Sequence, residues 1–200
     1  MKHELGLESL DCGSSKAFAV ADHQVAHVYV NDASIAEEVR EVVLGTDGVE
    51  EIREGCDLWG KGIGADRGGD FVAVSKEDAW FTYYYWEDDS KAPDFARCID
   101  IHRKPGYDPV ELFLDPKIKF PIVKIAGFLA KKKLGLRGLM DVIPLDANLV
   151  KGSHGRDNVS PHEQPVAVGR GAGKVTSAEE VFCWIRDSLT NSLSGDSTTR

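Results

Sequence analysis

Apolar residues near the start of the chain fall into two short runs, residues 17–21 and 25–30, with polar residues between them. The second run is rich in β-branched valine, and both have the length and composition of strands. Asn31 and Asp32 follow as helix-capping residues, ahead of apolar positions at one helical face. A helix is therefore predicted to end just before Gly45, and a short strand is predicted over 49–52.

Two further apolar runs, Asp70 to Ser75 and Trp80 to Trp86, are separated by only four residues. This spacing predicts a β-hairpin with aromatic side chains on both faces. The Gly-rich stretch 57–69 and the Pro-interrupted stretch 87–116 are predicted to be loops.

The second half of the chain contains two helix patterns. From Pro121, apolar residues recur on one helical face and Lys131, Lys132 and Lys133 lie near its end. Ser177 and Glu180 form a capping box that opens a helix expected to bury Val181, Phe182, Ile185 and Leu189. A last strand is predicted over 165–169, and residues 191–200 form a polar, disordered tail.

Strands that alternate with helices predict an α/β fold. Because the strands are few, residues 1–190 are interpreted as one incomplete region, with part of a mixed or mostly parallel sheet flanked by helices.

Composition narrows the function classes. The net charge of −9 argues against a protein that coats nucleic acid, because an acidic surface repels phosphate backbones. The four cysteines lie far apart and predict reduced, mostly buried thiols. With no signal-peptide pattern and no apolar stretch long enough to cross a bilayer, a cytoplasmic protein is expected.

Asp22 and His23 follow an apolar run, where α/β hydrolases place metal ligands. Carboxylate and imidazole together suit Zn²⁺. In one unbroken strand these two side chains would point to opposite faces, so a shared ion requires a break or bulge near Gln24. An ordinary strand with hydrogen-bonded polar residues explains the pattern equally well.

His154 lies between glycines in the stretch 152–158, where the backbone leaves room for a ligand on both sides. Nearby, Arg156 has the planar guanidinium that clamps phosphate. Taken alone, a histidine in a Gly-rich turn more often has only a structural role.

Six stretches in this order resemble the later part of bacterial alkaline phosphatase superfamily proteins of the nucleotide pyrophosphatase/phosphodiesterase type. They cover most of residues 11–190 and are Ala17–Val30, Gly69–Val74, Ala79–Trp86, Asp100–Leu112, Met140–Pro144 and Gly152–Gly155.

The resemblance implies that Asp22, His23 and His154 ligate two divalent ions, commonly zinc, and that Arg156 contacts a phosphorylated small molecule or nucleotide. It also implies that the nucleophilic Thr or Ser and further ligands lie in an N-terminal half outside this sequence. No catalytic residue is therefore assigned, and the isolated chain is expected to be inactive and to self-associate or to require that half in trans.

Two alternatives remain open at this stage. One is a non-catalytic binding or scaffold module of the same fold, which the missing nucleophile favours. The other is a protein that associates with a membrane surface through the helix within residues 120–133. The substrate is beyond what the sequence indicates.

Overall fold

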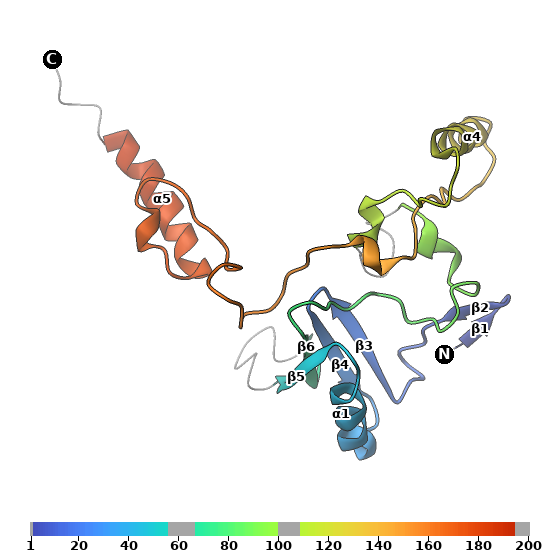
Figure 1. Ribbon diagram of the computed structural model, residues 1–200, viewed down its shortest axis with the longest axis horizontal. Helices are drawn as coiled ribbons and strands as arrows, with labels where there is room; N and C mark the ends of the chain where they lie inside the picture. Colours follow the sequence, from blue (N-terminus) through green and yellow to red (C-terminus); the bar gives the residue numbers. More distant parts are fainter. Residues whose placement is uncertain (1, 56–66, 100–108, 195–200) are drawn as a thin grey trace. The chain divides into compact units, whose positions relative to one another are not determined.

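The computed structural model describes residues 2–55, 67–99 and 109–194. Contacts divide the chain into two compact units, Met1–Asp157 and Asn158–Arg200, and each is described by itself (Figure 1). Most of the loop predicted over 57–69 lies outside the described residues.

The centre of the first unit is a four-stranded sheet with the order β3-β4-β6-β5. Its strands are β3 (Ala17–Asp22), β4 (Val25–Val30), β6 (Phe71–Ser75) and β5 (Val49–Glu54). The strands predicted at the first two apolar runs, at 49–52 and at 70–75 are confirmed.

The expectation of a mostly parallel sheet is wrong, because every strand pair in the described residues is antiparallel. β3 and β4 are separated by only His23 and Gln24. A two-residue connection can join only antiparallel strands, since a parallel pair needs a crossover of a dozen residues or more. The broader α/β assignment holds, with helices beside an antiparallel sheet.

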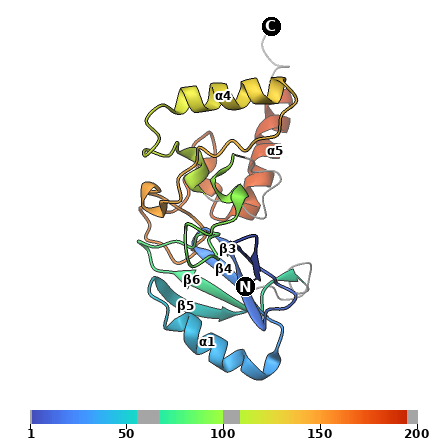
Figure 2. The ribbon, with the colours of Figure 1, turned by 90° about the vertical axis from the view of Figure 1, so that its right-hand side faces the viewer.

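β6 is buried along its whole length, and the core cluster of Ala26, Val49 and Ala73 is centred on it. Helix α1 (Ala36–Leu44) packs beside β5 and β6 (Figure 2). It follows a 3-10 turn capped by Asp32, as predicted, and its residue Arg40 lies 5.2 Å from the Phe71 ring centre. This cation–π contact helps to fix the helix on the sheet.

The predicted hairpin partner of β6 is also wrong, because residues 80–86 form no strand. In the sheet order, β6 already lies between β4 and β5, so both of its edges are hydrogen-bonded. The aromatic segment instead crosses the end of the sheet, where Phe81 packs against the core cluster.

A two-stranded sheet precedes the main one, formed by β1 (Lys2–Glu4) and β2 (Leu7–Ser9). Glu8 on β2 is only 3% exposed, and its carboxylate accepts hydrogen bonds from the backbone N–H groups of Glu87 (2.7 Å) and Asp88 (3.4 Å). The bond from Glu87 is the main cause that lowers the pKa of Glu8, and Lys91 adds to it. This carboxylate anchors the segment after residue 86.

The remainder of the first unit contains the predicted helix α4 (Pro121–Lys133), with proline at its first position. Short 3-10 turns lie at Asp94–Arg97, Pro109–Leu112 and Ala147–Leu149. Val110, Val142 and Ile143 in this part of the chain are almost completely buried.

The second unit contains a 3-10 turn, Ala172–Lys174, and helix α5 (Ala178–Ser194). Glu180 caps the helix start by accepting hydrogen bonds from Thr176 and Ser177, close to the predicted capping box. The loop before α5 packs on the helix, where the indole N–H of Trp184 donates to the Arg170 carbonyl at 3.0 Å.

Four further expectations need correction. Residues 165–169 form no strand. Of the α5 residues expected to be buried, Val181 is half-buried, whereas Phe182, Ile185 and Leu189 are exposed, with Phe182 at 70%. Cys12 and Cys183 are exposed, and only Cys98 of the three described cysteines is buried. The helix runs to Ser194, so the predicted tail overlaps its last turn, and residues 195–200 lie outside the described residues.

Candidate functional site

The candidate site begins at the β3–β4 turn, where the break predicted near Gln24 is present. β3 ends at Asp22, and His23 has a φ of 58°, in the left-handed region that histidine tolerates better than most residues. Gln24 is buried, and its side-chain amide donates to the carbonyls of Glu77 and Ala79, each at 3.3 Å. The hydrogen bonds of the buried glutamine therefore stabilise the turn. His23 lies outside regular strand geometry, so the alternation of side chains along β3 does not determine its direction.

The loop 153–157 lies across this end of the sheet. The backbone N–H of Gln24 donates to the His154 carbonyl at 2.9 Å. Gly155, with a φ of 122°, follows at a close approach to the turn: a β-carbon there would lie 3.5 Å from the Asp22 carbonyl oxygen. Glycine is required here because other residues rarely adopt this φ.

Two arginines fasten the same loop to β5. The guanidinium of Arg53 contacts the Asp157 carboxylate at 2.8 Å and also the Glu51 carboxylate, and these two bonds raise the pKa of Arg53. Arg156 bonds to Glu50 and to the carbonyl of Ser75. The loop position is thus determined by contacts with the β3–β4 turn, with β5 and with Ser75 at the end of β6.

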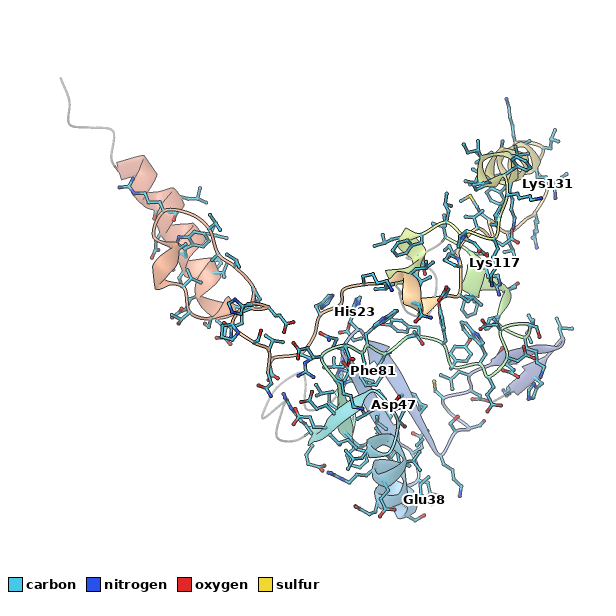
Figure 3. The ribbon with its side chains drawn as sticks, viewed as in Figure 1. His23, Glu38, Asp47, Phe81, Lys117 and Lys131 are labelled. Atoms are coloured by element: carbon cyan, nitrogen blue, oxygen red, sulfur yellow. The ribbon has the colours of Figure 1, made fainter. Side chains whose placement is uncertain are left out.

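As a result, His23 and His154 meet although 130 residues separate them in sequence. Their ring centroids lie 4.1 Å apart with the ring planes tilted by 35°. The hydroxyl of Ser153 lies 3.4 Å from Nδ1 of His23. Figure 3 shows His23 at the sheet end, near Phe81, whose N–H donates to the His23 carbonyl at 2.7 Å.

The His23–His154 pair is close to the spacing that a shared ion demands. Two imidazoles that bind one Zn²⁺ at 2.0–2.1 Å with a tetrahedral angle have ring centroids about 5 Å apart. The observed 4.1 Å separation is a partly stacked arrangement. To share one ion, the two rings would have to separate by about 1 Å and each turn one nitrogen toward a common point.

Asp22 lies next to this pair in the backbone but not in the same cluster. Its side chain is exposed at the end of β3, and the alternation of a strand places it on the face opposite the buried Ala21. Within residues 2–55, 67–99 and 109–194, no three His, Cys, Asp or Glu side chains are grouped closely enough to hold a metal ion. The structure therefore brings two of the three predicted ligands together.

Arg156, predicted to bind phosphate, is turned inward. Its side chain is only 7% exposed, and its guanidinium is engaged with Glu50 and the Ser75 carbonyl. In this arrangement it positions the loop that carries His154. A phosphate would have to displace the Glu50 carboxylate to reach it.

Two contributors to the site were not predicted from the sequence. The sequence predicts a break near Gln24 but not the buried position of its side chain, although a glutamine within apolar strands signals a buried hydrogen-bonding role. Ser153 carried no signal beyond its position before His154. Comparisons of the chain with protein families, with curated proteins and with solved structures find no match.

Proposed function

We propose that this chain is the C-terminal portion of a metal-dependent phosphoester or phosphodiester hydrolase, to which it contributes His23 and His154 as metal ligands. The carrying observation is the 4.1 Å approach of the two imidazoles across 130 residues of sequence. The resemblance of the surrounding stretches to nucleotide pyrophosphatase/phosphodiesterase-type proteins supports the same proposal.

The residue types at this site suit the proposal. Imidazole nitrogens are preferred ligands for zinc and related ions. The Ser153 hydroxyl lies near Nδ1 of His23, and such a neighbour orients a ligating ring and selects its tautomer. Gln24 and the two arginines hold the backbone beneath both rings, so the pair is in place before any ion binds.

Two histidines do not complete a site. Zinc takes four ligands in structural sites, and in catalytic sites three protein ligands with a water or substrate. In the proposed enzyme, the other ligands and the nucleophilic hydroxyl come from the N-terminal half that the resemblance implies. Bound divalent ions would stabilise negative charge on the phosphoryl oxygens, and His23 and His154 would hold one of them in place.

Metal binding by calorimetry tests the ligand assignment directly. The unmodified chain is titrated with Zn²⁺ at pH 7.5. The variants His23→Ala and His154→Ala, and His162→Ala as a control, are titrated in the same way. His162 is also exposed but lies in the second unit. We expect each of the first two changes to lower Zn²⁺ affinity by at least about tenfold, and the control to leave it within a factor of two.

If all four proteins bind Zn²⁺ with equal affinity, His23 and His154 are not the ligands, and the proposal is wrong. Acid provides a second check, because metal-bound histidine must be neutral and Zn²⁺ binding should weaken as the pH falls.

Activity assays test the second half of the proposal. With Zn²⁺ or Mn²⁺ and a chromogenic phosphodiester or pyrophosphate, the chain alone is expected to show no turnover. A rate of about 1 per second or faster, abolished by His154→Ala, would show that this chain carries its own nucleophile.

A second candidate function is a binding or scaffold module without catalysis. The exposed apolar face of α5 favours it, because Phe182, Ile185 and Leu189 form a helical stripe that soluble helices normally cover. Zinc binding separates the two candidates, since a scaffold has no need of His23 and His154 as ligands.

A further inference from the structure

Residues 117–137 have a charge pattern unlike the rest of the chain. This segment has seven cations and no carboxylate, whereas the whole protein has a net charge of −9. The cations are Lys117, Lys119, Lys124, Lys131, Lys132, Lys133 and Arg137. Helix α4 forms the centre of this basic segment.

The basic segment is also apolar at its surface. On α4, Ile122 is 80% exposed and Leu129 is 53% exposed, and at 100° per residue the two lie within about 20° of each other around the helix. Phe120 before the helix and Leu134 and Leu136 after it are exposed as well. By the same rule, the half-buried Ile125 lies about 40–60° from these two residues around the helix, and the half-buried Phe128 about 100–120° from them.

Cations border this exposed apolar stripe. Lys132 and Lys133 follow Leu129 by three and four positions, so they neighbour it on the helix surface. All three lysines at the helix end are exposed, and Figure 3 shows Lys131 on α4 and Lys117 on the approach to it. Lys124 has another role, because its ammonium contacts both the carbonyl oxygen (2.6 Å) and the carboxylate (2.8 Å) of Asp141.

We propose that the basic segment docks on an anionic lipid surface, with Ile122 and Leu129 inserted at the headgroup boundary. An exposed apolar stripe bordered by lysines is the pattern of interfacial helices. Long lysine side chains can place their aliphatic part beside lipid while the ammonium reaches the phosphate groups. Each lysine near an anionic leaflet adds to the attraction.

A protein partner fits this surface less well than lipid does. Lysine is depleted in protein–protein interfaces, because burying its strongly hydrated ammonium is costly. The apolar face of α5 provides the contrast: that helix has three acidic residues and only one cation, Arg186, so it lacks attraction to an anionic surface. Among the described residues no helix is long and apolar enough to cross a bilayer, so α4 would lie along the surface.

Vesicle co-sedimentation of the full chain tests the proposal. Vesicles of phosphatidylcholine alone are compared with vesicles containing phosphatidylglycerol at about one lipid in three, at 0.1 M salt. The first variant changes Lys131, Lys132 and Lys133 to Gln. The matched control removes the same charge elsewhere, at the exposed Lys16, Lys76 and Lys151. A third variant, Ile122→Gln with Leu129→Gln, removes the apolar contacts.

We expect binding to the anionic vesicles only, a loss of at least about tenfold in affinity for the α4 lysine variant, and little change in the control. The Ile122/Leu129 variant should also bind more weakly. Circular dichroism confirms that each variant keeps its helix content. Absence of binding by the unmodified chain, or equal binding by the two lysine variants, overturns the proposal.

Sedimentation equilibrium without lipid tests whether the same surface binds a second copy of the chain. A dimer of the unmodified chain that the Ile122/Leu129 variant dissociates would show that this surface pairs with a second copy. That result would also overturn the lipid assignment. The proposal does not depend on metal binding, since none of its residues belongs to the His23–His154 site.

Discussion

Replacing Gly155 with alanine should release the loop that brings His154 to His23. The φ of 122° at this position is rarely adopted by residues with a β-carbon. Space is not the obstacle, because the new β-carbon would lie 3.4 Å from the Gln24 nitrogen and 3.5 Å from the Asp22 oxygen, both ordinary contact distances. The cost therefore comes from backbone strain.

The magnitude follows from two opposing terms. A residue held in such a backbone conformation costs about 1–3 kcal/mol. Alanine also restricts the unfolded chain, which returns about 0.4–1 kcal/mol. The net loss in the free energy of unfolding should be about 1–2 kcal/mol, unless the loop moves to relieve the strain.

Gly152→Ala is the matched control in the same loop. Its φ lies outside the left-handed region, and nothing is within 4 Å of the added β-carbon. This variant should be as stable as the unmodified chain, or more stable by about 0.4–1 kcal/mol.

Urea unfolding followed by circular dichroism measures both variants. With a slope of about 2 kcal/mol per molar urea, the Gly155→Ala midpoint should fall by about 0.5–1 M. Nuclear Overhauser contacts between the His23 and His154 rings should weaken in the same variant, whichever way the strain is relieved. If Gly155→Ala leaves both the midpoint and the ring contacts unchanged, or if Gly152→Ala is equally damaging, the backbone does not determine the approach of the two rings.

Three smaller changes test other parts of the fold. The pKa of Glu8 is lowered in the folded protein, so its carboxylate stabilises the fold above the ordinary glutamate pKa of about 4.3. This stabilisation is lost as the pH falls through the lower pKa of the folded state. Glu8→Gln should therefore make the free energy of unfolding less sensitive to acid. Gly169→Ala should displace the loop on α5, because its β-carbon would lie 2.8 Å from Cζ2 of Trp184, and near-UV circular dichroism should lose the corresponding indole signal. Gly127→Ala, with open space around the new β-carbon in α4, should raise the free energy of unfolding by about 0.5–1 kcal/mol in a urea titration, and an unchanged or lower value would contradict that reasoning.

Local signals predicted the helices well. Asp32 accepts the Ser34 N–H at the start of the α1 region, Glu180 closes the start of α5, and Pro121 opens α4. These contacts lie within a few residues of one another, so the sequence alone contains both partners. The same local signals did not predict burial: Phe182, Ile185 and Leu189 of α5 are expected to be covered, and all three are exposed.

Sheet topology could not be predicted in the same way. The spacing of the two apolar runs around residue 77 is compatible with a hairpin, but β6 pairs with β4 and β5, whose paired residues lie 17 to 49 positions earlier. Which segments pair with β6 depends on strands that are distant in the sequence, and the spacing of neighbouring apolar runs does not predict it. The aromatic segment 80–86 does not pair with β6 and instead covers the end of the sheet in an irregular conformation.

The candidate site shows the same division between local and non-local information. The sequence indicated which residue types could bind a metal, and the geometric objection to a continuous strand correctly required a break at Gln24. It gave no reason why loop 153–157 should lie over that turn. The reason is a set of contacts from the Gln24 backbone N–H and from the Arg53 and Arg156 side chains, and the partners of these groups lie too far away in the sequence to be predicted.

These contacts determine how metal binding and stability should be related. The loop is held by a buried backbone hydrogen bond and two ion pairs, so the imidazoles are near each other without an ion. An ion that binds only the folded state then adds stability by mass action alone, about 2.7 kcal/mol at a free concentration one hundred times the dissociation constant. In Gly155→Ala the order of the loop would itself depend on the ion, so weaker Zn²⁺ affinity and a larger change in protein order on binding should appear together. If His23 and His154 were only a structural stack, the variant would lose stability with no change in its response to Zn²⁺.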